Sequence, residues 1–279
     1  GMFLALDELV DQYAPEMLDM FKQYPDVRKS MTAPDGKMYM LPAVNQCYHC
    51  RSSDTRTWIY KPYADAVGMK GDGPDTIAEF EAMLKEIKAK YPNVAPISSE
   101  AKTSPLALIE AAYLNVGTNR LRRDGTKIVY TPLDDNYRKA LILANKWVKD
   151  GLLDKLAWSQ NADALKARCM AAGASQVAVV PGGSQGSFST VTYTDPNARY
   201  RQFQPIKPFK GPDGKAYVPW TYDPGNVVGL IIPKKSKNPQ MMVQWGDYQM
   251  SLMSTLNMRL GPTFWGWAAA GEKGIDGRQ

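Results

Sequence analysis

The chain has 279 residues, with 34 Lys and Arg against 28 Asp and Glu, so its formal net charge is +6. The apolar fraction of 44% and the charged fraction of 22% exclude disordered and collagen-like sequences, and the length favours two lobes or one large α/β unit. No apolar run approaches the roughly 18 residues that a membrane-spanning helix needs. The basic residues are scattered along the chain, so we expect no nucleic-acid binding.

Helix and strand patterns alternate along the chain. In the first half, the pattern predicts helix over 6–24 with a break at Pro15, strands over 37–44 and 57–60, helix over 76–91, strand over 94–97 and helix over 106–116. In the second half, it predicts strand over 127–130, helices over 134–151 and 162–172, strands over 176–180 and 227–232, and helix over 239–256. This alternation predicts an α/β fold with at least one largely parallel sheet.

The motif Cys47-Tyr48-His49-Cys50 holds the single histidine of the chain. One histidine excludes most His-based triads and multi-histidine metal sites, and the third thiol, Cys169, lies in a predicted helix. Because the motif follows a strand and does not begin a helix, a structural or disulfide-bonded loop is favoured over redox or metal chemistry. We therefore predict no metal and no cofactor.

A glycine-rich segment over 181–187 follows the predicted strand over 176–180. It has no Lys-Ser/Thr pair after it and no G-x-G-x-x-G spacing, so it does not match a nucleotide loop. Backbone amides and small polar side chains at the carboxyl end of a strand are well placed to face a ligand. We expect Gln185 to contribute to a binding site there.

The sequence is rich in aromatic residues, with 7 Trp and 15 Tyr, and several lie in turn-rich segments where aromatics are less often part of the core. Aromatic rings near Asp, Arg and Gln suit sugars, because a pyranose offers an apolar face and hydroxyls that need partners. The aromatic candidates are Tyr48, Trp58, Trp158, Trp220, Tyr222, Trp265 and Trp267, and the polar ones are Arg51, Asp54, Gln185 and Asp223. By contrast, Trp147 and Trp245 lie within predicted helices and are expected to be core or helix-packing residues.

Two enzymatic or redox alternatives stay open. A glycosidase needs two acids flanking a cleft, and Asp54 and Asp223 both lie near the aromatic segments. The first alternative is therefore a sugar-active hydrolase, and the second is a redox or adhesion module built on Cys47 and Cys50.

Nine short segments carry a resemblance to a known family: 6–9, 13–15, 32–39, 47–50, 58–59, 76–80, 151–154, 233–239 and 245–248. In this order, they resemble the family 1 extracellular solute-binding proteins of ABC transporters. The resemblance is closest to the lipoprotein branch of aldouronate and oligosaccharide transport.

The resemblance implies a type II periplasmic-binding-protein-like architecture, in which two α/β lobes hold a ligand in a cleft and close on binding. One lobe would take residues 1–97 with 227–279, and the other 98–226, with hinges at 98–103 and 225–226. Family members usually carry an export signal, a lipid-anchoring cysteine and a longer C-terminal portion. We therefore expect this chain to be a central fragment whose first lobe is incomplete at its N-terminus.

The sequence thus predicts a non-catalytic, extracytoplasmic protein that captures an oligosaccharide or acidic sugar and delivers it to an ABC permease. We expect a monomer that is a membrane-anchored lipoprotein in its full-length form. Export also predicts that Cys47 and Cys50 are oxidised or structurally protected. The predicted ligand-binding residues are Tyr48, Arg51, Asp54, Trp58, Trp158, Gln185, Trp220, Tyr222, Asp223 and Trp265.

Overall fold

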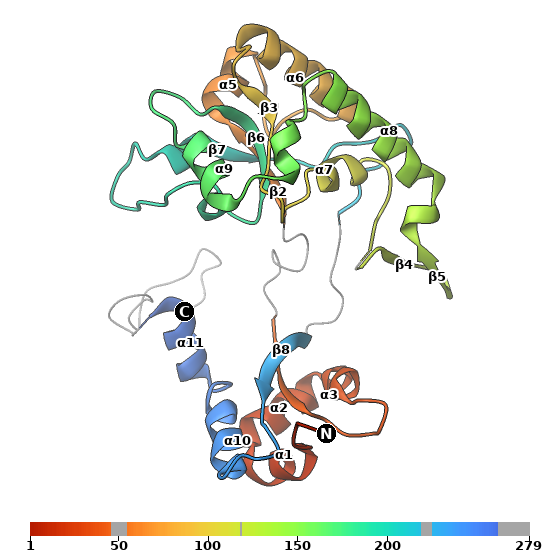
Figure 1. The fold of residues 1–279 in the computed structure, drawn as a ribbon, viewed down its shortest axis with the longest axis vertical. Coiled ribbons are helices and arrows are strands. Elements are labelled where there is room, and N and C mark those ends of the chain that lie inside the picture. Colours follow the sequence, from red (N-terminus) through yellow and green to blue (C-terminus); the bar gives the residue numbers. More distant parts are fainter. Residues whose placement is uncertain (46–54, 118, 219–224, 262–279) are drawn as a thin grey trace. The chain divides into compact units, whose positions relative to one another are not determined.

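The computed structural model describes residues 1–45, 55–117, 119–218 and 225–261. The chain forms two compact units, which are coloured along the sequence in Figure 1. Unit 1 comprises Gly1–Gln46 and Tyr222–Gln279, and unit 2 comprises Cys47–Thr221. Within the described ranges, the helices are too short or too polar to span a membrane.

Unit 1 combines a two-stranded antiparallel sheet with helices. Its strands are β1 (Met40–Val44) and β8 (Gly225–Ile231). Its helices are α1 (Asp7–Tyr13), α2 (Pro15–Gln23), α3 (Pro25–Met31), α10 (Pro239–Tyr248) and α11 (Leu252–Leu260). The predicted break at Pro15 is confirmed, because this residue opens α2, where its missing N–H costs nothing.

The helix predicted over 239–256 is two helices in the structure. Ser251 caps α11 by accepting a hydrogen bond from the Ser254 N–H, which starts a new helix instead of extending α10. Of the two roles predicted for Trp245, core or helix packing, the core role is wrong, since its exposed fraction is 60%. The residues of α10 that are buried are Val243, Gly246 and Asp247.

Unit 2 is built on a four-stranded sheet in the order β3-β6-β2-β7. The strands are β2 (Arg56–Tyr60), β3 (Ala95–Ile97), β6 (Val177–Gly182) and β7 (Phe203–Ile206). Strand β2 runs antiparallel to both of its neighbours, while β3 and β6 are parallel. The expected largely parallel sheet is therefore a mixed sheet, because strand patterns in a sequence do not encode strand direction.

The remaining elements of unit 2 surround this sheet. The α-helices are α5 (Lys61–Ala66), α6 (Ile77–Lys90), α7 (Leu106–Glu110), α8 (Asp135–Lys149) and α9 (Ala162–Cys169). A separate hairpin is formed by β4 (Leu121–Asp124) and β5 (Lys127–Tyr130). The short 3-10 helices are η1 (Thr131–Leu133), η2 (Lys155–Trp158), η3 (Gln185–Ser187) and η4 (Arg199–Gln202).

Local sequence signals explain several of these boundaries. Thr76 and Glu79 form the predicted capping box of α6, and each accepts a backbone N–H of the other residue. Gly151 follows α8 with φ +66, a conformation that other residues avoid. Helix α7 is shorter than predicted, because turns replace the helix after Glu110.

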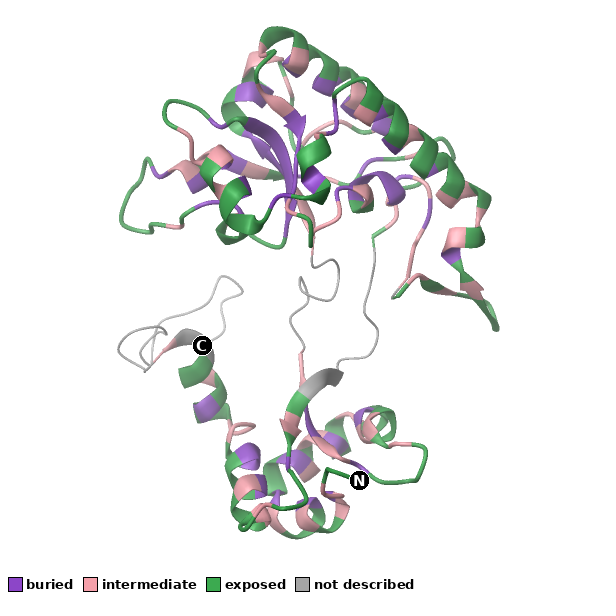
Figure 2. Cartoon of the chain, in the orientation of Figure 1, coloured by how far each residue is buried: buried purple, intermediate pink, exposed green. Residues whose placement is uncertain are grey.

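The core of unit 2 lies on both sides of the sheet, as the purple segments in Figure 2 indicate. All six residues of β6 are buried. On one side, Phe80 of α6 stacks on Phe209 at 4.2 Å between ring centroids and packs against the fully buried Trp147 of α8. The prediction that Trp147 is a core residue is confirmed.

The boundary between the units differs from the predicted lobes. Because β2 lies between β6 and β7, residues 47–97 belong to unit 2 and not to the first lobe. The predicted hinge at 98–103 is also wrong, since Ser98 and Ser99 are fully buried inside unit 2. The chain re-enters unit 1 at Tyr222, close to the predicted hinge at 225–226.

Candidate functional site

The strands of unit 2 bring several loops to one edge of the sheet. Strands β6 and β7 end at the edge where β2 begins, since Arg56 pairs with Gly182 and Thr57 pairs with Ile206. In α/β proteins, ligands bind at the carboxyl ends of such strands. The segments after β3, β6 and β7 are therefore the candidate site-forming loops.

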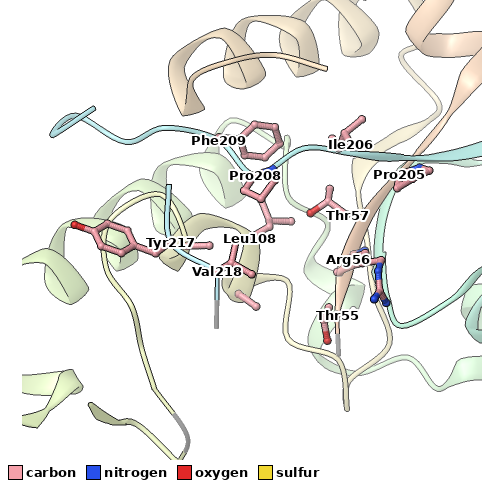
Figure 3. Close-up of a pocket in the computed structure, with 13 residues that line it drawn as sticks. Thr55, Arg56, Thr57, Leu108, Pro205, Ile206, Pro208, Phe209, Tyr217 and Val218 are labelled. Carbon is pink, nitrogen blue, oxygen red and sulfur yellow. The ribbon is translucent and has the colours of Figure 1, made fainter. Parts of the chain in front are cut away.

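A cavity of about 250 Å³ lies at this edge, and Figure 3 shows the side chains around it. It is lined by Thr55, Arg56, Thr57, Ala107, Leu108, Ala111, Pro181, Pro205, Ile206, Pro208, Phe209, Tyr217 and Val218. Most of these side chains are apolar, and the polar groups come mainly from the start of β2. An apolar cavity with few polar groups is typical of small-ligand sites.

Two side chains of β2 fix the end of β6 and the glycine-rich segment after it. Arg56 Nη1 donates to the Gly183 carbonyl at 2.9 Å, and Trp58 Nε1 donates to the Gly182 carbonyl at 2.8 Å. A Cβ at Gly182 would come within 3.2 Å of the Phe188 ring, so only glycine fits without a shift. The start of the glycine-rich segment is thus held by defined contacts.

Three of the predicted site residues lie within the described ranges. Trp58 is only 7% exposed, and its ring packs beside Phe188 with centroids 6.2 Å apart. Gln185 is half-buried in η3, where its carbonyl accepts the N–H groups of Phe188 and Ser189. Trp158 ends η2 and is 44% exposed. The structure does not bring these three side chains into the cavity, and their ligand-binding roles stay predictions.

The other predicted site residues lie outside the described residues: Tyr48, Arg51, Asp54, Trp220, Tyr222, Asp223 and Trp265. The same holds for Cys47, His49 and Cys50. Six of the seven site residues belong to two segments, 46–54 and 219–224, which continue directly into the cavity-lining residues Thr55 and Val218. The cavity therefore adjoins the parts of the sequence in which most of the site was predicted.

The sequence analysis missed the apolar lining of the cavity. Leu108 comes from α7, and Ile206, Pro208 and Phe209 come from the end of β7 and the segment after it. The run Pro205 to Phe209 has the residue period of neither a helix nor a strand. This irregularity is the one sequence signal that could have pointed to it as part of a site. Only the sheet order places this run beside β2 and α7.

A buried polar cluster lies at the end of β3. Arg168 Nη1 donates to Asp154 Oδ2 at 2.6 Å and to Gln160 Oε1 at 3.0 Å, while Gln160 Nε2 donates to Ser98 Oγ at 2.8 Å. Burial alone would raise the pKa of Asp154, but hydrogen bonds from the Leu156 N–H, Arg168 and Ser98 outweigh burial and lower it. Asp154 is therefore an ionised structural group that fixes the loop after β3.

Metal and thiol chemistry find little support in the described part of the chain. Among the residues with a described position, no group of three or more His, Cys, Asp or Glu side chains could hold a metal ion. Cys169 is fully buried, and burial raises the pKa of its thiol to about 12. Its thiol therefore stays protonated at neutral pH and is unreactive.

Comparison with known proteins finds similarity to a transport protein. No family model matches it. The fructooligosaccharide ABC transporter substrate-binding protein FusA of Streptococcus pneumoniae serotype 4 is 22% identical over 283 residues, covering 94% of this chain and 49% of FusA. The chain thus spans about half the length of the curated relative that it matches.

Solved structures agree with this match. FusA in complex with kestose has a TM-score of 0.77 at 19% identity, covering 99% of this chain and 56% of that chain. A human-milk-oligosaccharide (HMO) binding solute-binding protein from Bifidobacterium longum infantis has a TM-score of 0.72 at 19% identity, covering 94% and 55%. The alginate-binding protein AlgQ2 without calcium ion has a TM-score of 0.71 at 22% identity, covering 100% and 56%.

These similarities confirm the predicted fold class and the resemblance drawn from the sequence. The solved structures share the mixed α/β fold of two-lobed, periplasmic-binding-protein-like sugar binders. This chain is accordingly similar in sequence to a substrate-binding protein of an ABC transporter and shares the fold of these solved structures.

Proposed function

We propose that this chain is the solute-binding component of an ABC importer, which captures an oligosaccharide outside the cytoplasm and delivers it to a membrane permease. The observation that carries the proposal is the extent of the likeness. The match to FusA covers 94% of the chain, and the fold match to FusA with kestose covers 99%. The permease partner, the lipoprotein anchor and the monomeric state are parts of the same proposal.

The chemistry of the cavity supports a sugar as the ligand. Proline, isoleucine and phenylalanine side chains offer apolar surfaces that can pack against the C–H face of a pyranose or furanose. The hydroxyls of Thr55 and Thr57 lie at the same cavity and are of the type that pairs with sugar hydroxyls. The Tyr217 hydroxyl donates to Asp213 at 2.8 Å, so this group is oriented by the protein itself.

The hydrolase and redox alternatives are less well supported. The relative FusA is a substrate-binding protein of an ABC transporter. The carboxylates proposed for hydrolysis, Asp54 and Asp223, lie outside the described residues, as do Cys47 and Cys50. We favour binding without turnover because the sequence match to FusA, a substrate-binding protein, covers 94% of the chain.

Isothermal titration calorimetry with a panel of neutral and acidic oligosaccharides, followed by product analysis of the same samples, tests the proposal. We expect saturable binding of at least one sugar that is recovered intact. Cleavage of the bound sugar would support the hydrolase, and no binding by any sugar would contradict the proposed ligand class.

A matched pair of variants tests the position of the site. Ala107 is an exposed residue of α7 that lines the cavity, so Ala107→Trp should fill the cavity and weaken sugar binding at least tenfold. Ala89 is an exposed residue near the end of α6 that does not line it, so Ala89→Trp should leave binding unchanged. Equal affinities for the two variants would place the sugar elsewhere.

A further inference from the structure

The hairpin of β4 and β5 has a largely apolar face that no described residue of unit 2 covers. Strand pairing places Leu121 opposite Tyr130 and Arg123 opposite Ile128, so these four side chains share one face of the hairpin. The exposed fractions are 48% for Leu121, 68% for Ile128 and 52% for Tyr130. Leu133, which follows in η1, is 83% exposed. Exposed apolar residues that gather in one place indicate a binding surface.

The opposite face of the hairpin is fixed to the start of α8. Arg122 Nη2 donates to Asp134 Oδ2 at 3.2 Å, and its cross-strand partner Val129 is half-buried. Asp134 also caps α8, because its Oδ1 accepts the Asn136 N–H at 2.8 Å. Figure 1 shows the hairpin at an end of unit 2 away from the four-stranded sheet, and Figure 2 shows that most of it is exposed. The apolar face is therefore held in place while it stays open to solvent.

Unpaired cations accompany this apolar face. Four cations of the hairpin and of the first two turns of α8 are exposed: Arg123, Lys127, Arg138 and Lys139. Among the described residues, none of these four forms an ion pair, whereas Arg122 is paired with Asp134. Two exposed carboxylates lie in the same segments, Asp124 and Asp135. This end of unit 2 therefore has an excess of positive charge.

Exposed apolar side chains next to unpaired cations match the surface of an anionic lipid bilayer. Apolar side chains enter the boundary between headgroups and acyl chains, and each Lys or Arg near an anionic surface raises the affinity about fivefold. Tyrosine is enriched at this depth, because its ring is apolar and its hydroxyl is polar. A stable protein–protein interface needs about 20 residues on each side, which is more than this hairpin offers. A lipid surface is thus a better match than a second protein.

We propose that the β4–β5 hairpin, with the start of α8, docks unit 2 on an anionic phospholipid surface. The proposal goes beyond the proposed function, because docking does not require a bound sugar. A protein that delivers its ligand to a permease works beside the membrane, and a salt-sensitive docking face would keep unit 2 near that surface.

Flotation of the full chain with lipid vesicles tests the docking face. We expect binding to phosphatidylcholine vesicles that contain phosphatidylglycerol, and binding about 10-fold weaker or less to pure phosphatidylcholine vesicles. Raising the ionic strength from about 0.01 M to about 1 M should remove most of the binding, because the Debye length falls from about 30 Å to about 3 Å.

One pair of variants tests the apolar side chains. Ile128→Ser with Leu133→Ser should weaken vesicle binding roughly 10-fold, and these side chains are too exposed for their loss to unfold the chain. The matched control is Met241→Ser with Leu252→Ser in unit 1, where the two residues are 64% and 75% exposed. This control should leave vesicle binding unchanged.

A second pair of variants tests the cations. Lys127→Gln with Arg138→Gln removes two of the unpaired charges and should weaken binding roughly 10-fold to 30-fold. The control is Lys22→Gln with Lys29→Gln in α2 and α3, which lowers the net charge equally at two exposed lysines of unit 1. The control should reduce binding less than 2-fold, because its charges lie outside the docking face.

The outcomes separate docking from other roles of the face. If the unmodified chain does not bind the anionic vesicles, or if the control variants lose as much binding as the hairpin variants, the docking face is wrong. If sedimentation velocity shows a dimer that Ile128→Ser with Leu133→Ser dissociates, the face is a contact between copies and the lipid proposal is overturned. Sugar binding is measured separately by calorimetry, so failure of the docking face leaves the proposed function standing. Circular dichroism of each variant checks that the fold is retained.

Discussion

The two units differ in how far their apolar residues are buried. In unit 2, helices and strands bury a continuous core on both faces of a four-stranded sheet. In unit 1, the sheet has two described strands, and α10 leaves Met241, Trp245 and Tyr248 between 59% and 64% exposed at positions that share one helix face. Apolar periodicity is thus present in both units, but whether a periodic face is buried depends on what packs against it.

The largest test of this difference is a pair of tryptophan substitutions. Trp147→Ala in α8 removes a fully buried ring and its indole hydrogen bond of 3.0 Å to Glu81, so we expect a loss of about 3–5 kcal/mol in the free energy of unfolding. Trp245→Ala in α10 removes a largely exposed ring and should change this free energy by less than about 0.5 kcal/mol. Urea denaturation measures both values, and similar losses would show that the α10 face is covered in solution.

The next test uses pH and concerns unit 2 alone. Burial alone would raise the pKa of Glu81, but hydrogen bonds from Lys146, Lys85 and Trp147 outweigh burial and lower it from 4.5 to about 2. Between pH 2 and pH 4.5, the unfolded chain therefore binds more protons than the folded chain. The network stabilises unit 2 above pH 4.5, and this stabilisation is lost as the pH falls towards 2. Because Lys146 is half exposed and screened, we expect a contribution on the order of 2 kcal/mol.

Glu81→Gln is the variant for this measurement. It should remove most of the dependence of the free energy of unfolding on pH between 4.5 and 2, as followed by denaturation at several pH values. Hydrogen exchange of α6 and α8 locates the effect. An unchanged pH dependence in this variant would assign the acid sensitivity to other groups.

The smallest expected effect lies in unit 1. Asp247 of α10 is 5% exposed and accepts the Met17 N–H at 2.7 Å and the Glu16 N–H at 3.4 Å, so it satisfies the first turn of α2 from another helix. Asp247→Asn keeps one acceptor oxygen but loses the charge, and we expect a loss of about 1 kcal/mol with faster hydrogen exchange in α2. Asp19→Asn is the control, because Asp19 is an exposed residue of α2. Equal exchange rates in the two variants would show that Asp247 does not hold α2.

Local signals predicted the element boundaries well where a single residue determines them. Pro15 begins α2, Thr76 caps α6 and Gly151 follows the end of α8. Each boundary depends on a conformational or hydrogen-bonding property of that residue itself. The patterns failed where a strand carries no local signal. The strand β4 was not predicted because its four residues, of which one is half-buried and three are exposed, carry no apolar alternation.

The candidate site was predicted only in part. The glycine-rich segment after β6 was recognised, and Gln185 and Trp158, which were expected in loops, lie in the short 3-10 helices η3 and η2. Trp58 was expected to contact a ligand, yet it is almost fully buried with its indole N–H bonded to Gly182. The ring packs beside Phe188, which is 130 positions away in the sequence, so this contact could not be predicted from the strand pattern around Trp58.

The sequence by itself determined the alternation of helices and strands, the caps that delimit them and the resemblance to solute-binding proteins, because these depend on residue type and short-range order. The tertiary structure decided the assignment of residues 47–97 to unit 2, the direction of β2 and the assembly of the apolar cavity from α7, β2 and the end of β7. These features arise from pairing between segments up to about 150 residues apart, such as Arg56 with Gly182 and Thr57 with Ile206. Such pairings are selected by the free energy of burying whole faces of the sheet, which no local pattern encodes.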